Sequence, residues 1–307
     1  MGNCFTFVML NRNMKNFNHL KLKINLNIFT MKKIIFTFCF AALTLLVNAQ
    51  TSETFYASGV SKMNAKDYSG AIGDFNSSIK MDAKFANAYY KKGMCEYLQK
   101  SYDKAITDFT NYIELKPLDD NGYYNRAMSW KQIEKFDNAI TDLYKVNELD
   151  PSNTNAMLKR GNLNYDEQQY ELALVDFTDF IEMKPNNVKG FYNRANTYKI
   201  MGIYDSAIID FQRAISIEPT FTDAYINLGA TFADVEDFET SVSIFTKALE
   251  ITPGEPDALF NRGVAYNNLQ MSGEACVDWK ASLMAGNQQA MVYYNKYCVK
   301  TLASGGN

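Results

Sequence analysis

The chain of 307 residues repeats one pattern every 34 residues. Small residues recur at this spacing without an insertion: Gly59, Gly93, Ala127, Gly161, Ala195, Gly229 and Gly263. A second small residue follows each of them by twelve positions: Ala71, Ala105, Ala139, Ala173, Ala207, Ser241 and Ala275. Four positions later stands a large apolar residue: Phe75, Phe109, Leu143, Phe177, Phe211, Phe245 and Trp279. A fixed period of this length indicates stacked units, none of which buries its apolar face alone.

Each unit has the pattern of two short helices, A and then B. Apolar residues stand at helical spacing on both sides of a polar turn. The small residues at positions 8 and 20 of the unit let the two helices approach closely. Proline at position 32 cannot continue helix B, so it fixes the turn into the next unit. This proline is present in five units: Pro117, Pro151, Pro185, Pro219 and Pro253.

The columns together resemble the tetratricopeptide repeat family, and the match spans residues 52–289. The units predicted are 52–85, 86–119, 120–153, 154–187, 188–221, 222–255 and 256–289. The resemblance implies an all-α, right-handed α-solenoid of helix-turn-helix repeats. Residues 290–300 have the pattern of one more helix, in which Tyr297 takes the place of the small residue at position 8. Since a tyrosine there would block a partner helix B, we expect a C-terminal capping helix, followed by a tail at 301–307.

The first fifty residues have the pattern of an export signal. Lys32 and Lys33 precede fourteen uncharged residues, and Val47-Asn48-Ala49 offers a small-residue cleavage site. We expect a signal peptide at 31–49, cleaved after Ala49, and a periplasmic or envelope-associated protein. The fourteen residues fall short of the roughly 20 that a spanning helix needs, although an uncleaved anchor stays an alternative. Residues 1–30 are predicted to be a mis-annotated or extended leader, and the pattern at Gly2 offers myristoylation as a further alternative.

Charge and composition restrict the chemistry of the chain. Residues 1–49 hold six basic residues and no acidic one, so the rest carries 25 basic against 34 acidic residues. An acidic body without a basic tract argues against a nucleic acid partner and against anionic membranes. The single histidine, His19, lies in the leader, which leaves the rest of the chain without a histidine for a catalytic triad or a metal site. No phosphate loop, nucleophile elbow or pair of buried carboxylates is evident. We therefore predict no enzyme, no metal and no cofactor.

The family resemblance places positions 2, 5, 6, 9, 12 and 13 of helix A on a concave surface. Asparagine recurs at position 6, and its carboxamide offers both a donor and an acceptor to a peptide backbone. This ladder resembles the peptide-gripping asparagines of one tetratricopeptide superhelix in a glycosyltransferase. The predicted peptide-binding residues in this column are Asn125, Lys159, Asn193, Asn227 and Asn261. The alternative is that Asn-Arg is simply a frequent variant of helix A.

Aromatic residues at position 5 are the second set of candidates, namely Tyr90, Tyr124 and Tyr192. Such side chains can anchor the apolar side chains of a partner, or they can pack between neighbouring units. Some family members bind acidic tails through a clamp of Lys and Asn. Tyr90 and Met94 stand where its first Lys and Asn belong, so the sequence does not predict that clamp.

The cysteines downstream of the signal are odd in number and lack zinc spacing: Cys95, Cys276 and Cys298. Buried free thiols are the default expectation. A bridge between Cys276 and Cys298 is the alternative in an oxidising compartment.

These features predict a noncatalytic scaffold of the cell envelope whose groove binds an extended segment of another protein. The alternative is a structural subunit of an envelope assembly that stacks through its convex face and its ends. After cleavage of the signal, no direct membrane insertion is expected.

Overall fold

The computed structural model describes Met31 and residues 51–299, and the described helices fall into two compact units. The predicted leader at 1–30, nearly all of the signal peptide at 31–49 and the tail at 301–307 lie outside the described residues. The first unit contains α2 (Ser52–Asn64) and α3 (Tyr68–Met81). The second unit begins at Ala86 and contains α4 to α16 and a final π-helical turn.

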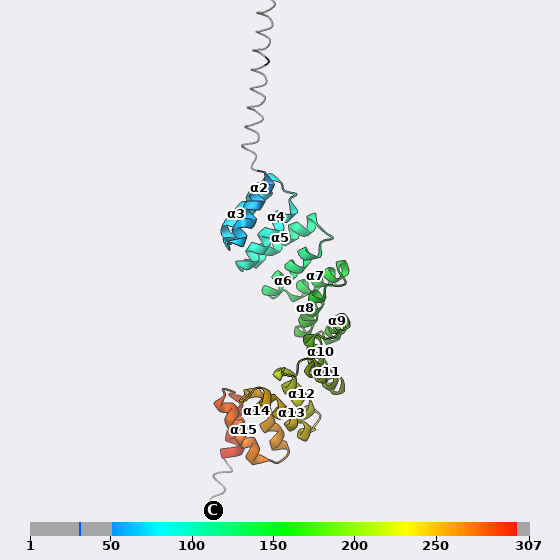
Figure 1. The fold of residues 1–307 in the computed structure, drawn as a ribbon, viewed down its shortest axis with the longest axis vertical. Helices are drawn as coiled ribbons and strands as arrows, with labels where there is room; N and C mark the ends of the chain where they lie inside the picture. The colour runs from blue at the N-terminus through cyan, green and yellow to red at the C-terminus, as the bar shows by residue number, and fades with distance from the viewer. Residues whose placement is uncertain (1–30, 32–50, 300–307) are drawn as a thin grey trace, which may run out of the picture. The chain divides into compact units, whose positions relative to one another are not determined.

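The helices of the second unit alternate between A and B along the chain (Figure 1). The A helices are α4 (Ala86–Leu98), α6 (Asp120–Gln132), α8 (Thr154–Asp166), α10 (Val188–Ile200), α12 (Thr222–Asp234) and α14 (Pro256–Asn268). The B helices are α5 (Tyr102–Leu115), α7 (Phe136–Leu149), α9 (Tyr170–Met183), α11 (Tyr204–Ile217), α13 (Phe238–Ile251) and α15 (Ser272–Met284). The predicted all-α solenoid of helix-turn-helix repeats is confirmed, and helices α5, α7, α9, α11 and α13 each end two residues before a proline.

Close contact within each pair depends on the small residue at position 8. A Cβ atom added at Gly161 would lie 2.6 Å from Cε1 of Phe177, and one at Gly263 would lie 2.7 Å from Cδ1 of Trp279. Real carbon atoms do not approach so closely, so a larger residue would force the helices apart. Phe177 and Trp279 are each 1% exposed. The small column and the large column therefore form one core contact, repeated along the chain.

The junctions between consecutive pairs show a complementarity that the sequence analysis missed. Where helix B carries an aromatic residue near its end, the next helix A has a glycine as its third residue: Tyr112 faces Gly122, and Phe180 faces Gly190. A Cβ atom on either glycine would lie 2.8 Å from the ring of its aromatic partner. At the junction after Val146, helix A has Ala156 instead. A small residue on one helix is thus matched by a large side chain on its neighbour, which keeps the junction close-packed.

A buried ion pair ties helix A to helix B in most repeats, through residues sixteen positions apart. Arg126 donates two hydrogen bonds to Asp142, at 2.8 and 2.7 Å. The same pairing joins Arg194 to Asp210 and Arg262 to Asp278. In these repeats a third arginine N–H reaches a threonine on the preceding helix B: Thr110, Thr178 and Thr246. The guanidinium group therefore links three helices and two repeats at once.

The repeat formed by α12 and α13 departs from this column. Leu228 stands in place of the arginine and is 2% exposed, and Ile244 stands in place of the aspartate. Both side chains belong to the apolar cluster around Phe211. An apolar pair therefore occupies the site that an ion pair fills in the neighbouring repeats.

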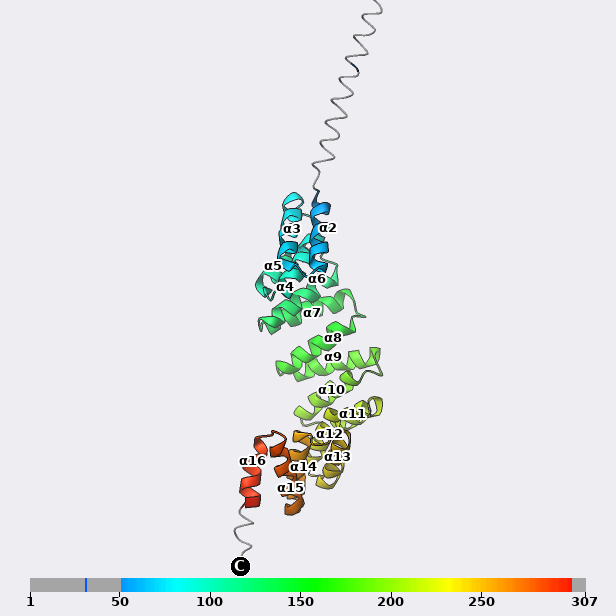
Figure 2. The ribbon, with the colours of Figure 1, turned by 60° about the vertical axis from the view of Figure 1, so that its left-hand side comes forward.

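The C-terminal end is covered by α16 (Gln289–Tyr294) and the π-helical turn η1 (Asn295–Val299), both of which contact α15 (Figure 2). The ring of Tyr297 packs against Trp279 of α15, with centroids 5.5 Å apart. Cys276 and Cys298 form a disulfide, so the default expectation of free thiols is wrong for these two residues. Packing brings the two cysteines together because η1 lies directly on α15. Cys95 is buried and free, as expected.

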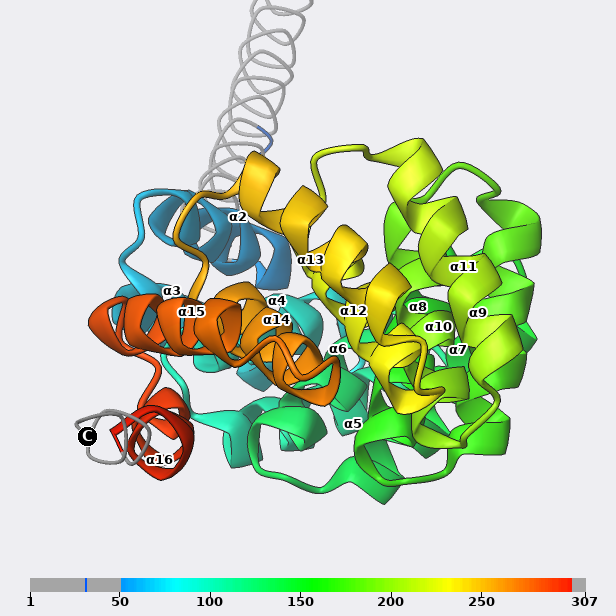
Figure 3. The same ribbon diagram turned by 90° about the horizontal axis from the view of Figure 1, so that it is seen from below.

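Helices A lie on the inner side of the array within the second unit. Contacts between successive A helices join α4 to α6, α8 to α10, α10 to α12 and α12 to α14, and no comparable contact joins two B helices in the described part of the chain. Figure 3 shows α8 and α10 lying inward of α9 and α11. None of the helices in residues 51–299 has the length and hydropathy needed to cross a membrane.

Candidate binding groove on the A helices

The inner side of the A helices presents positions 2, 5, 6, 9, 12 and 13 of each repeat, which we call the groove face. These positions lie on one side of an α-helix because the helical period brings them together. Positions 7 and 11, which carry the ion pairs and their neighbours, turn toward helix B instead. The groove face therefore holds the side chains of helix A that remain available to a partner.

Two asparagines of the predicted ladder already use both of their N–H groups. The amide nitrogen of Asn125 donates to the hydroxyl of Tyr90 at 3.0 Å and to the carbonyl of Asn121 at 2.8 Å. Asn227 repeats this arrangement with Tyr192 and the carbonyl of Asp223, each at 3.0 Å. A carboxamide has two donors, so only its oxygen remains for a ligand at these two positions.

The other members of the ladder keep more of their hydrogen-bonding capacity. Asn193 donates one bond to the side-chain oxygen of Asn162, at 2.8 Å, and retains a second N–H and its oxygen. Asn261 makes no side-chain hydrogen bond to any described residue, and Lys159 makes no salt bridge there. The ladder is thus interrupted at Lys159, and its asparagines differ in the hydrogen-bonding groups that they offer.

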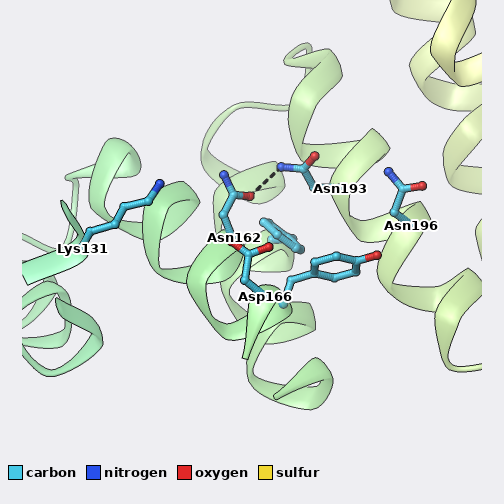
Figure 4. A pocket seen from close by; sticks show the side chains of 7 residues that line it. Lys131, Asn162, Asp166, Asn193 and Asn196 are labelled. Atoms are coloured by element: carbon cyan, nitrogen blue, oxygen red, sulfur yellow. Dashed lines mark hydrogen bonds between the residues drawn. The ribbon is translucent and has the colours of Figure 1, made fainter. Parts of the chain in front are cut away.

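A polar pocket of about 290 Å³ lies on the groove face of α8 and α10 (Figure 4). Its polar lining comes from Lys131, Asn162, Tyr165, Asp166, Asn193 and Asn196. The bond between Asn193 and Asn162 leaves the amide nitrogen of Asn162 and the oxygen of Asn193 open, one donor and one acceptor. This is the complement of a peptide group. Asn162 and Asn196 stand at position 9, where the two preceding repeats have Met128 and Met94, and this change was the signal that sequence reasoning missed.

The predicted tyrosine anchors are largely occupied by the protein itself. The ring of Tyr90 lies 5.0 Å from that of Tyr112, and the ring of Tyr192 lies 4.9 Å from that of Phe221. Burial raises the pKa of both hydroxyls, and of Tyr124. The hydroxyls of Tyr90 and Tyr192 accept bonds from the asparagine of the next repeat. These contacts favour the alternative interpretation, in which the tyrosines pack between units.

Two buried carboxyl groups lie close together inside the α4/α5 repeat, which corrects the expectation that no such pair exists. Glu96 is 4% exposed and Asp108 is 3% exposed. Desolvation and the neighbouring Asp108 raise the pKa of Glu96 to about 8. Lys92 donates to Asp108 at 3.1 Å. The pair is enclosed between the two helices rather than open to the groove. No cluster of three or more metal-ligating residues is found in the described residues.

Comparison with known proteins agrees with the repeat. Sequence models of the tetratricopeptide repeat match residues 56–120, 121–153, 188–221 and 222–255. The chain belongs to the tetratricopeptide repeat family. Tetratricopeptide repeats generally serve as noncatalytic protein-interaction modules. No curated protein matches the sequence.

Solved structures of other tetratricopeptide repeat proteins share the fold. The C-terminal part of one from Cytophaga hutchinsonii is 18% identical, with a TM-score of 0.67, over 77% of this chain and 98% of that one. One from Parabacteroides merdae is 17% identical, with a TM-score of 0.56, over 81% of this chain and 99% of that one. YrrB, described as a protein with an unusual peptide-binding site, is 23% identical, with a TM-score of 0.52, over 61% of this chain and 97% of that one. At these identities the likeness shows the fold alone.

Proposed function

We propose that this protein is a noncatalytic scaffold of the cell envelope that holds an extended segment of another protein in its groove. The observation that carries the proposal is the polar pocket on α8 and α10, where the amide nitrogen of Asn162 and the oxygen of Asn193 are unused. A peptide backbone presents one N–H and one C=O per residue, so it can satisfy both groups together. The peptide-binding site named for YrrB supports the same use of the fold.

The uneven ladder refines the choice of contact residues. Asn162, Asn193 and Asn261 have open donors, whereas Asn125 and Asn227 contribute an acceptor only. We propose that the first set makes the principal contacts with a bound backbone. Lys159 then contributes charge rather than a paired donor and acceptor.

Export to the envelope is part of the proposal. The basic, apolar and small-residue pattern at 31–49 supports it. The disulfide between Cys276 and Cys298 supports it independently, because disulfides persist in oxidising compartments and are rare in the cytosol.

A photo-crosslinking amino acid at Asn162, compared with one at the helix-B residue Thr107, tests the groove in the native host. We expect the groove position to capture a protein whose crosslinked peptide, once synthesised, binds the purified scaffold. Replacing Asn162, Asn193 and Asn261 together with alanine should weaken that binding by about one to three decades, since each net hydrogen bond contributes about 0.5–1.5 kcal/mol. Unchanged affinity of the triple variant would overturn the groove assignment.

One observation favours the structural subunit as a second candidate. Three B helices expose aliphatic side chains at the same position, namely Val175, Ile209 and Val277, which are 56%, 64% and 68% exposed. Exposed apolar residues on one side of an array can form a contact between subunits. Crosslinking from Thr107 alone, with none from Asn162, would support this candidate.

A further inference from the structure

The groove face of the second unit changes its charge between α10 and α12. On α4, α6, α8 and α10 it carries Lys91, Lys131, Lys159, Lys189 and Lys199, against a single carboxylate, Asp166. On α12 and α14 it carries Asp223, Asp234 and Asp257, and no basic residue. Acidic residues exceed basic ones by nine outside residues 1–49. A basic surface on four consecutive helices of so acidic a chain is therefore a local feature of the groove.

The charges on this face are mostly unpaired. Lys199 forms a salt bridge with Asp234 at 3.6 Å, where the two signs meet. The other four lysines form no salt bridge with any described residue, and Lys91 lies 5.7 Å from the ring centroid of Tyr90. Two lysines on helix B differ, since Lys145 and Lys247 pair with glutamates three residues further on, each at 2.8 Å. These two charges are thus paired locally on helix B, whereas four of the five lysines on the groove face have no ion-pair partner among the described residues.

We infer that the groove selects an extended peptide whose charges are segregated, with an acidic stretch along α4 to α10 and a basic stretch against α12 and α14. This inference rests on the proposed function, because it names the class of peptide that the groove holds. Neighbouring helices are spaced by about 10 Å, and an extended chain advances about 3.3 Å per residue. The acidic stretch therefore spans about nine residues, and the whole peptide about fifteen.

Segregated charge also sets the direction of the bound chain. A peptide placed in reverse would bring its acidic stretch against Asp223 and Asp257, and like charges at close range disfavour that arrangement. The pocket between Lys131 and Asp166 contains one charge of each sign, so it is suited to neutral backbone groups. In this arrangement the asparagine amides bind the peptide backbone. The lysines and aspartates determine which peptide sequence binds and in which orientation.

Labelled sixteen-residue peptides provide the test. One peptide has four glutamates in its first half and four lysines in its second half, a second has the halves exchanged, and a third alternates the same residues along its whole length. We expect at least one block peptide to bind about tenfold more tightly than the alternating peptide in fluorescence anisotropy at low salt. The preference should shrink as salt is raised, because screening weakens exposed ion pairs.

Two variants of the full chain make the test specific to the groove. In the first, Lys91, Lys131, Lys159 and Lys189 are replaced with glutamine; in the matched control, Lys80, Lys145, Lys247 and Lys280 on helix B are replaced. Exposed ion pairs change affinity by about 1.5- to 5-fold each, so we expect the groove variant to lose about tenfold or more for the block peptide. The control changes the net charge equally and should lose less than about twofold.

Reversing the acidic end gives the complementary result. With Asp223→Lys and Asp257→Lys, an all-glutamate block should bind better than the mixed block peptide. Equal binding of block and alternating peptides, or equal losses in the groove variant and the control, would overturn the inference. If alanine at Asn162, Asn193 and Asn261 abolishes binding of the crosslinked segment while the lysine variant retains it, the proposed function stands and the charge inference fails.

Discussion

The α12/α13 repeat differs from the repeats on either side of it in the contact between helix A and helix B. One site is filled in two ways, by an ion pair in the flanking repeats and by an apolar pair in the α12/α13 repeat. In the flanking repeats an arginine that is 18 or 19% exposed reaches an aspartate that is 5% exposed. In the α12/α13 repeat, Leu228 and Ile244 fill the same place without charge. Both solutions keep the helix pair intact and in register with its neighbours. The ion pair is therefore not required for the helix-turn-helix to form.

The difference lies in what else the arginine does. Arg194 bonds to Thr178 in the preceding repeat as well as to Asp210. Leu228 makes no such link, and the hydrogen bond from Asn227 to Tyr192 joins its repeat to the preceding one instead. A buried ion pair is weak support for stability when compared with a well-packed apolar pair. Its distinct contribution here is to hold three helices in one relative position.

The largest effect should come from breaking the ion pair on one side only. Arg194→Leu leaves Asp210 buried without its partner, and we expect a loss of about 3–5 kcal/mol in the free energy of unfolding. Adding Asp210→Ile copies the apolar pair of the α12/α13 repeat and should restore most of the loss. Urea denaturation followed by circular dichroism measures both variants. A double variant as unstable as the single one would show that the two solutions are not interchangeable.

A second comparison concerns the residue that faces this aspartate from position 11. In the α8/α9 repeat, Asn164 donates to Asp176 at 2.8 Å; in the α4/α5 repeat, Glu96 stands at the corresponding place. The pKa of Glu96 is raised to about 8 in the folded protein and is near 4.5 when unperturbed. Its contribution to stability is therefore complete below about pH 4.5 and is lost as the pH rises to about 8. Asp108, Lys92 and Lys104 are the charged groups that act on it.

We expect the free energy of unfolding to fall by up to about 5 kcal/mol across this pH window, because the pKa of Glu96 is raised from 4.5 to about 8 and each pKa unit corresponds to about 1.4 kcal/mol. Glu96→Gln, which keeps a donor for Asp108 as Asn164 does for Asp176, should remove this part of the pH dependence. Melting temperatures between pH 4.5 and 9 measure it. An unchanged slope in the Gln variant would assign the effect to other groups.

The hydrogen bond between repeats is a smaller contribution. Tyr192→Phe removes the acceptor of Asn227 and should cost about 0.5–1.5 kcal/mol. Tyr90→Phe, which removes the equivalent acceptor of Asn125, should cost a similar amount. Because the ion pair supports the α6/α7 repeat but not the α12/α13 repeat, we expect the Tyr192 variant to be the more harmful of the two. Chemical denaturation of both variants decides whether the amide bond compensates for the missing arginine.

The smallest effect concerns the turn between helices A and B. A left-handed residue occurs there in every described repeat, and it is a glycine only at Gly202. Gln168 has a φ of 60° at the equivalent place, where a side chain is disfavoured. Gln168→Gly should raise the stability by about 0.5–1 kcal/mol, measured as a shift in melting temperature. Gly202→Gln should lower it by a similar amount.

The sequence was sufficient to predict the parts of the fold that depend on local pattern. The helices, the small columns and the prolines recur at a fixed spacing, so they could be predicted from residue types alone. The ion-pair column was missed, although its arginines and aspartates recur every 34 residues, because Arg194 and Asp210 meet only once the register between two helices is known. The disulfide between Cys276 and Cys298 was predicted only as the alternative to free thiols for the same reason, since it depends on how η1 lies on α15.

The sequence predicted where the groove residues lie, but it did not predict which of their hydrogen-bonding groups remain free for a ligand. The column of asparagines was visible in the sequence, whereas the use of both donors of Asn125 and Asn227 by neighbouring groups requires coordinates. Asn162 and Asn196 could have been singled out because they are the two polar residues in a column of otherwise apolar residues at position 9. The assignment of peptide contacts to any of these residues stays a prediction.

The covered C-terminal end also determines how far an array of repeats can grow. An uncapped helix B displays the surface on which a further repeat would stack, and a second copy of the chain could use it to polymerise. Here α16 occupies that surface on α15, and the bond between Cys276 and Cys298 makes its departure a chemical step rather than a thermal fluctuation. The cap thus covers the surface on which a further repeat would stack. A further repeat or a second copy of the chain therefore cannot stack on α15 while the cap is in place.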